Sequence, residues 1–133
     1  MTAGARQEFA VPGLAPPVSH YCDAVRFGDL LFISGLVGVD EQGKVVRAGD
    51  AARQTRQIFE NMKKVLDAAG ASFADVLKVT VFMTDIDDRP AINPVRQEFF
   101  GAARPASTLV EVRKLVCPDL LLEIEAVVGL PRR

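Results

Sequence analysis

The amino-acid sequence predicts a single α+β domain in which a mixed β-sheet carries two helices on one face. The length of 133 residues fits one compact domain, which we place at residues 1–133. The hydrophobic content of 49% and the charged content of 25% are typical of a folded globular chain. Local patterns follow the order strands, helix, strand, helix, strand, strand, without an internal repeat. This order is typical of α+β domains.

An extended arm and a hairpin are predicted for the first part of the chain. Residues 1–20 contain Pro12, Pro16 and Pro17 and no hydrophobic period, so we expect an extended N-terminal arm. Strands predicted at 22–27 and 29–34 flank a tight turn at Gly28-Asp29, because Gly followed by Asp favours hairpin turns. A short third strand at 36–39 leads into a polar turn.

A long helix is predicted over residues 51–69. Asp50 can cap its first turn, and Gly70 can end it in the left-handed conformation. Apolar residues recur at helical spacing and give the helix one face to pack on a sheet. These residues are Ile58, Met62, Val65, Leu66 and Ala69.

A strand and a second, shorter helix are predicted next. Residues 76–84 are rich in β-branched side chains, which favour a strand. Pro90 and Pro94 fit best near a helix start, where the amide hydrogens that they lack would be unpaired anyway. We therefore place the second helix at 94–100, with Asn93 as its cap.

Two strands are predicted at the end of the chain, at 108–115 and 121–128. In the second of them, apolar residues alternate with Glu123 and Glu125, which therefore share one face of the strand. The simpler interpretation is a face exposed to solvent, or a subunit interface with basic partners such as Arg113. The other interpretation is a functional carboxylate.

Charge and cysteine content exclude several classes of protein. The net charge is −1 without a basic segment, so we expect no nucleic-acid partner. The longest apolar stretches are strand-sized and no signal peptide is recognisable, which predicts a cytosolic protein without membrane contact. Cys22 and Cys117 are then expected to be free thiols. No spacing of Cys or His suggests a metal site.

Several polar residues are candidates for a site, each with a simpler explanation. His20 and Tyr21 could supply acid-base chemistry, but an anchor for the arm is favoured. Ser34-Gly35 ends the second predicted strand and could contact a ligand, although a plain strand end is favoured.

The second predicted helix offers two further candidates. Asn93 is adequately explained as a helix cap. Arg96 lies one turn further on and could share its face, although a solvated surface cation is the simpler interpretation.

Taken together, these residues and several ordered motifs resemble the RidA family, also called YjgF/YER057c/UK114. The motifs are Tyr21, GDLLFISG (28–35), KVTVFMTD (78–85), Asn93 with EFF (98–100), RPAS and VEV (104–112) and EIEA (123–126). The resemblance implies a chorismate-mutase-like fold, a homotrimer and ligand clefts between subunits. It also implies hydrolysis of enamines and imines, such as 2-aminoacrylate, to ketoacids and ammonia without a cofactor.

The resemblance assigns roles to individual residues. Tyr21 falls on the family's pocket tyrosine, Ser34 and Gly35 on its Ser-Gly pair, and Asn93 on its pocket asparagine. Glu123 falls on the glutamate thought to position the attacking water.

One motif departs from the family pattern. Active deaminases of the family usually read Pro-Ala-Arg-Ser, and that arginine clamps the substrate carboxylate. Here Ser107 stands in its place and Thr108 follows, so the chain resembles a branch without the arginine, and this hydroxyl pair is expected to line the cleft. Either another arginine serves, with Arg96 preferred over Arg104 and Arg113, or the ligand is less anionic or larger than 2-aminoacrylate.

Two functions therefore follow as hypotheses. The first is a homotrimeric enamine or imine deaminase for a small metabolite other than 2-aminoacrylate, with an aminomuconate-type compound as one candidate and Glu123 positioning water. The second is a non-catalytic trimer that binds a metabolite or a regulatory partner in the same clefts. A role in RNA cleavage is the least favoured, because a basic surface is missing.

Overall fold

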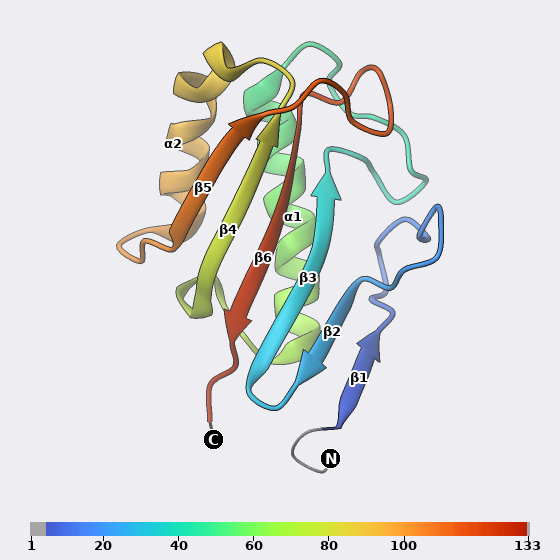
Figure 1. Cartoon of the computed structure of the whole chain (residues 1–133), viewed down its shortest axis with the longest axis vertical. Helices are drawn as coiled ribbons and strands as arrows, with labels where there is room; N and C mark the ends of the chain where they lie inside the picture. The colour runs from blue at the N-terminus through green and yellow to red at the C-terminus, as the bar shows by residue number, and fades with distance from the viewer. Residues whose placement is uncertain (1–4, 133) are drawn as a thin grey trace.

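The structure is a computed structural model that describes residues 5–132. Six strands form one sheet in the order β1-β2-β3-β6-β4-β5, and two long helices pack on the same face of it (Figure 1). The strands are β1 (Arg6–Phe9), β2 (Ala24–Phe27), β3 (Leu30–Val37), β4 (Val76–Met83), β5 (Ala106–Glu111) and β6 (Leu122–Gly129). The helices are α1 (Ala51–Ala69) and α2 (Arg89–Phe100), with single 3-10 turns η1 (Phe73–Asp75) and η2 (Ile86–Asp88).

The sheet is mixed, as the sequence predicts. β4 and β5 pair in parallel, whereas all the other neighbours are antiparallel. α2 connects the two parallel strands and crosses behind them, as parallel pairing requires (Figure 1). The α+β architecture with both helices on one face is confirmed.

The helix over residues 51–69 is confirmed together with both of its ends. The side chain of Asp50 accepts a hydrogen bond from the amide of Arg53, and Gly70 has a φ of 73° in the left-handed region. The predicted apolar face packs on the sheet: Ile58, Met62, Val65 and Leu66 are buried, and Ala69 is partly buried against the core. A cluster of four phenylalanines joins this helix to α2 and η1: Phe59, Phe73, Phe99 and Phe100.

One prediction for the first strands is wrong, and one strand was missed. Residues 6–9 of the predicted arm are extended as expected, but they form β1, which pairs with β2 at the edge of the sheet. The strands predicted at 29–34 and 36–39 are one strand, β3, which continues through Ser34 and Gly35. The pairing with β6 shows the reason: an irregularity between Ile33 and Leu36 lets the strand continue past these two small residues.

The predicted start of the second helix is also wrong. α2 begins at Arg89, so Pro90 occupies the first turn and Pro94 lies inside the helix, where it forfeits one backbone hydrogen bond. Asn93 is consequently an exposed residue of the second turn and not the cap. The strand predicted at 108–115 is observed as Ala106–Glu111, earlier and shorter than expected.

The face of the sheet away from the helices is uncovered in the single chain. Strand alternation places exposed apolar side chains here, next to Glu125. They include Leu30, Phe32, Leu77 and Val110.

Candidate functional site

An irregularity in β3 sets Gly35 directly against the side chain of Glu123 on β6. Between Ile33 and Leu36 the strand advances three residues while its partner advances two, from Ala126 to Ile124, which is a β-bulge. A Cβ atom placed on Gly35 would lie 2.2 Å from Oε2 of Glu123 and 2.8 Å from its Cδ. A side chain at this position would therefore displace the carboxylate of Glu123, and glycine leaves it in place.

Ser34 holds the bulge in place. Its Oγ donates a hydrogen bond to the carbonyl of Cys22 at 2.6 Å, and its amide donates to the carbonyl of Asp23 at 3.0 Å. The hydroxyl is therefore used to attach β3 to the chain that enters β2. The prediction that Ser34-Gly35 ends a strand is wrong, because the pair lies within β3 and shapes it.

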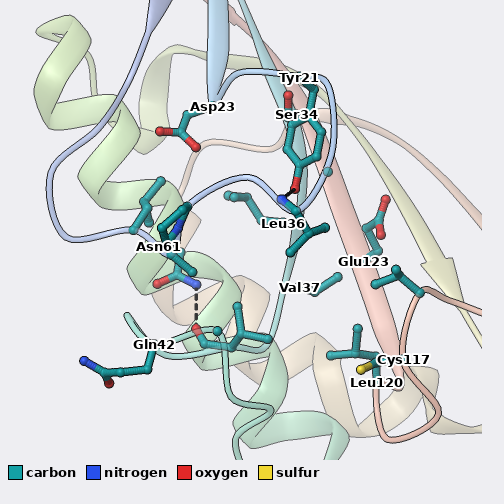
Figure 2. A pocket seen from close by; sticks show the side chains of 18 residues that line it. Tyr21, Asp23, Ser34, Leu36, Val37, Gln42, Asn61, Cys117, Leu120 and Glu123 are labelled. Atoms are coloured by element: carbon teal, nitrogen blue, oxygen red, sulfur yellow. Dashed lines mark hydrogen bonds between the residues drawn. The ribbon is translucent and has the colours of Figure 1, made fainter.

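A cavity of about 380 Å³ opens beside Glu123 (Figure 2). Its wall comes from the arm, the end of β3, α1 and the loop before β6. Four of the predicted site residues lie in it together, namely Tyr21, Ser34, Gly35 and Glu123. His20 does not line it.

The polar side chains in this cavity are mostly used by the fold. Asp23 accepts from the amide of Val11 at 2.7 Å, and Asn61 on α1 donates to the carbonyl of Val39 at 3.0 Å. The hydroxyl of Tyr21 accepts a long hydrogen bond of 3.4 Å from the amide of Val18. The carboxylate of Glu123, by contrast, accepts no hydrogen bond from the described residues, so its oxygens face the cavity unpaired.

The surroundings of Glu123 disfavour its charge. The side chain is half-buried, and burial raises the pKa of this carboxyl above its ordinary value. Repulsion from Glu125, two residues away on the same face of β6, raises the pKa further. A carboxylate without partners and with a raised pKa, at the wall of a cavity, is a candidate acid or base.

A second hollow, of about 640 Å³, lies between α2 and the chain that enters β5. Asn93, Arg96 and Arg104 line it, and its lining contains no Asp or Glu. Nη2 of Arg96 donates to Oγ of Ser107 at 2.9 Å, and no acidic side chain among residues 5–132 pairs with this guanidinium. Burial lowers the pKa of Arg96, because desolvation disfavours its charge. The hollow is thus electropositive and has hydrogen-bond donors free for an anion.

The predicted hydroxyl pair is split between two faces of β5. Ser107 lies beside Val79 of β4, which is buried against the helices, and binds Arg96. Thr108 lies beside Thr80 on the opposite face, where it accepts a hydrogen bond from Nζ of Lys78 at 3.1 Å. The two hydroxyls therefore do not act as a pair in one subunit, because neighbouring residues of a strand point in opposite directions.

The two hollows share no lining residue. The cavity of Glu123 lies beside the two central strands of the sheet, β3 and β6, whereas the hollow of Arg96 lies beside the chain that enters the edge strand β5. The predicted site residues are therefore divided into two groups. Arg113, the remaining candidate for the substitute arginine, is exposed and lines neither hollow.

Gln54 is a positioning residue that sequence reasoning missed. It is fully buried on α1; its Nε2 donates to the carbonyl of Asp119 at 2.9 Å, and its Oε1 accepts from the amide of Leu121 at 2.8 Å. These bonds fix the chain two residues before Glu123. The sequence contained a sign of this role. Gln54 lies four residues before Ile58, so it is a polar residue on the apolar face of the helix.

Neither cysteine is paired in a disulfide: Cys22 is partly buried and Cys117 is exposed at the cavity wall. Within residues 5–132 no group of three His, Cys, Asp or Glu side chains is placed to hold a metal ion. The described helices include none that is both long and apolar enough to cross a bilayer.

Comparisons with known proteins place the chain among sequence relatives and solved structures of the same fold. The family model described as Endoribonuclease L-PSP matches residues 13–129. The chain is 42% identical over 122 residues to the 3-aminoacrylate deaminase RutC of Acinetobacter baylyi, covering 91% of this chain and 96% of that protein. It is 38% identical over 116 residues to a 2-iminobutanoate/2-iminopropanoate deaminase of Dermatophagoides farinae, covering 86% and 90%. The crystal structure of RidA from an Antarctic Psychrobacter superposes with a TM-score of 0.87 at 33% identity, covering 93% of this chain and 99% of that one.

Proposed function

Because this chain belongs to the Endoribonuclease L-PSP family, also called the RidA or YjgF family, we propose that it is a cofactor-independent deaminase of a small enamine or imine. The observation that carries the proposal is the unpaired carboxylate of Glu123, held against Gly35 at the wall of a cavity. Two relatives whose names state deamination of 3-aminoacrylate or of 2-imino acids support the reaction class. Ammonia release from imines generated in the assay tests it.

Glu123 acts in this proposal as the base that holds the attacking water. The carboxylate accepts a proton from water while the oxygen adds to the carbon of the C=N bond, and it returns that proton to the nitrogen, which gives a carbinolamine. The carboxylate then takes the proton of the new hydroxyl group and passes it to the nitrogen as the C–N bond breaks, so that a ketone and ammonia leave and Glu123 is ionised again. The raised pKa suits this exchange, because a carboxyl closer to neutrality both accepts and returns a proton readily. An enamine first becomes an imine by protonation at carbon.

Activity should fall on acidification at a higher pH than an ordinary glutamate would give. The ionised carboxylate is the active form, so lowering the pH through its pKa removes activity. Burial, together with repulsion from Glu125, raises that pKa above the ordinary value of a glutamate. The fall of kcat on the acidic side of its pH profile measures this pKa. Glu125→Gln removes the repulsion, so the fall should move to lower pH while kcat at neutral pH changes little. A fall that stays in place in this variant would contradict the assigned coupling.

Arg96 supplies the anion-binding group in this account. Its guanidinium occupies the neighbourhood of Ser107, the position at which the resemblance places the missing arginine, and no acidic residue competes for it. Because the hollow of Arg96 and the cavity of Glu123 are separate within one subunit and share no lining residue, we propose a homotrimer in which each cleft joins the Glu123 cavity of one subunit to Asn93 and Arg96 of the next. The uncovered apolar face of the sheet supports such an association.

Arg96→Ala should weaken the binding of a substrate carboxylate. Loss of a charge-assisted hydrogen bond costs about 1.5–3 kcal/mol, so KM should rise roughly tenfold to a hundredfold while kcat changes less. Arg89→Ala is the matched control, because Arg89 is exposed on the same helix and lines neither hollow. An unchanged KM in Arg96→Ala would remove Arg96 as the clamp.

Mixed oligomers test whether the two groups act across a subunit boundary. Unfolding Glu123→Gln together with Arg96→Ala and refolding the mixture gives clefts of which about one quarter contain both natural residues. Under the proposal, activity returns to about that fraction of the natural rate. If the mixtures are no more active than the separate variants, Glu123 and Arg96 do not act together in one cleft.

One observation favours a second function, that of a non-catalytic metabolite-binding or regulatory trimer. Ser107 stands where the family's clamping arginine is expected, so the ligand differs from that of the typical enzyme. A dianionic compound of the aminomuconate type is less well supported, because the lining of the Glu123 cavity contains no Lys or Arg for a second carboxylate. RNA cleavage is disfavoured by the net charge of −1, although the family description names an endoribonuclease.

A further inference from the structure

Glu123 lies at the beginning of β6, so its position depends on how the chain enters this strand. Val37, the last residue of β3, pairs with Glu123, and Leu121 lies two residues before it. The carbonyl of Leu121 accepts a hydrogen bond from the amide of Thr84 at 3.0 Å, which attaches the entry into β6 to the end of β4. The amide of Leu121 has its partner on α1.

That partner is Gln54, which binds the entry into β6 with both ends of its side-chain amide. Oε1 accepts from the amide of Leu121 at 2.8 Å, and Nε2 donates to the carbonyl of Asp119 at 2.9 Å. Nε2 also makes a longer hydrogen bond of 3.4 Å to the carbonyl of Arg47, in the turn before α1. The side chain is fully buried, so these hydrogen bonds are shielded from water and hold the segment firmly.

The end of β3 packs directly on the same residue. A Cβ atom placed on Gly38 would lie 2.9 Å from Cβ of Gln54 and 3.1 Å from its Cα, so a side chain here would push the two segments apart. Gly38 follows Val37, the residue that pairs with Glu123. Gln54 therefore contacts the chain on both sides of Glu123, at the end of β3 and at the entry into β6.

We propose that Gln54 is a positioning residue for the deamination, which sets the carboxylate of Glu123 in the place that the reaction requires. This inference rests on the deaminase function proposed above and adds a residue to it. Gln54 has no exposed surface and does not line the cavity of Glu123, so it acts through the strands that it holds. Misplacement of a reacting group by about 1 Å costs about a hundredfold in rate.

Gln54→Met tests the proposal, because methionine keeps the length of the side chain and removes its hydrogen bonds. The amide of Leu121 and the carbonyl of Asp119 then lack their partner, so the entry into β6 should shift. We expect kcat for hydrolysis of 2-iminopropanoate to fall about tenfold to a hundredfold. KM should change less, because Gln54 does not contact the substrate.

Thr55→Val is the matched control for a loss of stability alone. Thr55 is the next residue of α1 and is also fully buried, but its hydroxyl donates within the helix, to the carbonyl of Ala51 at 2.7 Å. This variant loses a buried hydrogen bond without a change at β6, so its kcat should stay within a few-fold of the natural value. Equal losses of kcat in Gln54→Met and Thr55→Val would overturn the inference.

The pKa of Glu123 reports the position of its carboxylate without catalysis. Burial raises this pKa, so a carboxylate that moves toward solvent should titrate at lower pH, which an NMR titration of its side-chain carbon measures. In Gln54→Met the pKa should fall toward the ordinary value of a glutamate, and in Thr55→Val it should not change. Such a fall, in a protein whose natural chain hydrolyses no imine, would support the positioning of Glu123 by Gln54 and overturn the deaminase.

Gly38→Ala disturbs the same contact from the side of β3 and keeps the hydrogen-bonding groups of Gln54. Gly38 does not have a positive φ, so alanine is not otherwise strained there, and the variant serves if Gln54→Met does not fold. It should lower both kcat and the pKa of Glu123. An unchanged kcat and an unchanged pKa of Glu123 in folded Gln54→Met, or in Gly38→Ala in its place, would overturn the inference.

Discussion

Replacing Glu123 by Gln is expected to lower kcat for imine hydrolysis by about a hundredfold to ten-thousandfold, the usual contribution of a positioned base. Glutamine keeps the shape of the side chain but cannot take a proton from water. Because the carboxylate has no hydrogen-bond partner among the described residues and its charge is disfavoured by burial, its removal should not destabilise the fold. Thermal unfolding and sedimentation should therefore match those of the natural chain.

The matched control for this variant is Glu125→Gln on the same face of the same strand. Glu125 is exposed and does not line the cavity, so its replacement should leave kcat at neutral pH within a few-fold of the natural value. Equal losses of kcat in the two variants would mean that the total negative charge on β6 determines the activity and that neither carboxylate alone acts as the base.

Gly35→Ala is expected to cost about a hundredfold in kcat through the displacement of Glu123 alone, as misplacement of a reacting group by about 1 Å does. A Cβ atom at this position would lie 2.2 Å from Oε2, so the carboxylate must move away from its position at the cavity wall. Gly35 does not have a positive φ, so alanine is not otherwise strained there. Activity assays on the folded variant measure the effect.

A double variant identifies the cause of that loss. If Gly35→Ala acts by moving Glu123, it should cost little further activity in the Glu123→Gln background, because the two changes act on one group. Gly129→Ala is the control within the same sheet, where the added Cβ would meet the flexible side chain of Leu77 at 3.2 Å. Full additivity of Gly35→Ala and Glu123→Gln would refute the proposed contact.

Regular elements of this fold could be predicted from the sequence because their patterns are local. The cap at Asp50, the stop at Gly70 and the alternation around Glu123 each depend on a few neighbouring residues. The strand from residue 76 and the helix from residue 51 begin where these patterns place them.

The errors occur where long-range pairing decides the structure. The bulge at Ser34-Gly35 resembles a strand end, because two small residues interrupt the pattern and only pairing with β6 reveals continuity. In α2, Pro90 and Pro94 are both tolerated, and the sequence does not say which of them begins the helix. Strand β1 depends on pairing with β2 and has no apolar alternation of its own.

In the candidate site too, features that depend on local motifs could be predicted, whereas features that depend on long-range packing could not. Glu123, Tyr21 and the Ser-Gly pair could be assigned from motifs, and they do share one cavity. Arg96 could be named from the sequence only as one of three candidates for the missing arginine. Its contact with Ser107 was not predicted, because it depends on the packing of α2 against β5. The separation of Arg96 from Glu123 within one subunit could not be predicted at all, since residue spacing along the chain does not give the order of the strands in the sheet.

The rate of ammonia release from 2-iminobutanoate, with and without the protein, tests the central claim most directly. We expect the natural chain to release ammonia well above the rate of spontaneous hydrolysis, and Glu123→Gln to lose nearly all of this acceleration. A natural chain that is folded and binds 2-oxobutanoate, yet leaves the spontaneous rate of this and of other short imines unchanged, would contradict the proposal and identify the cavity as a binding site without catalysis.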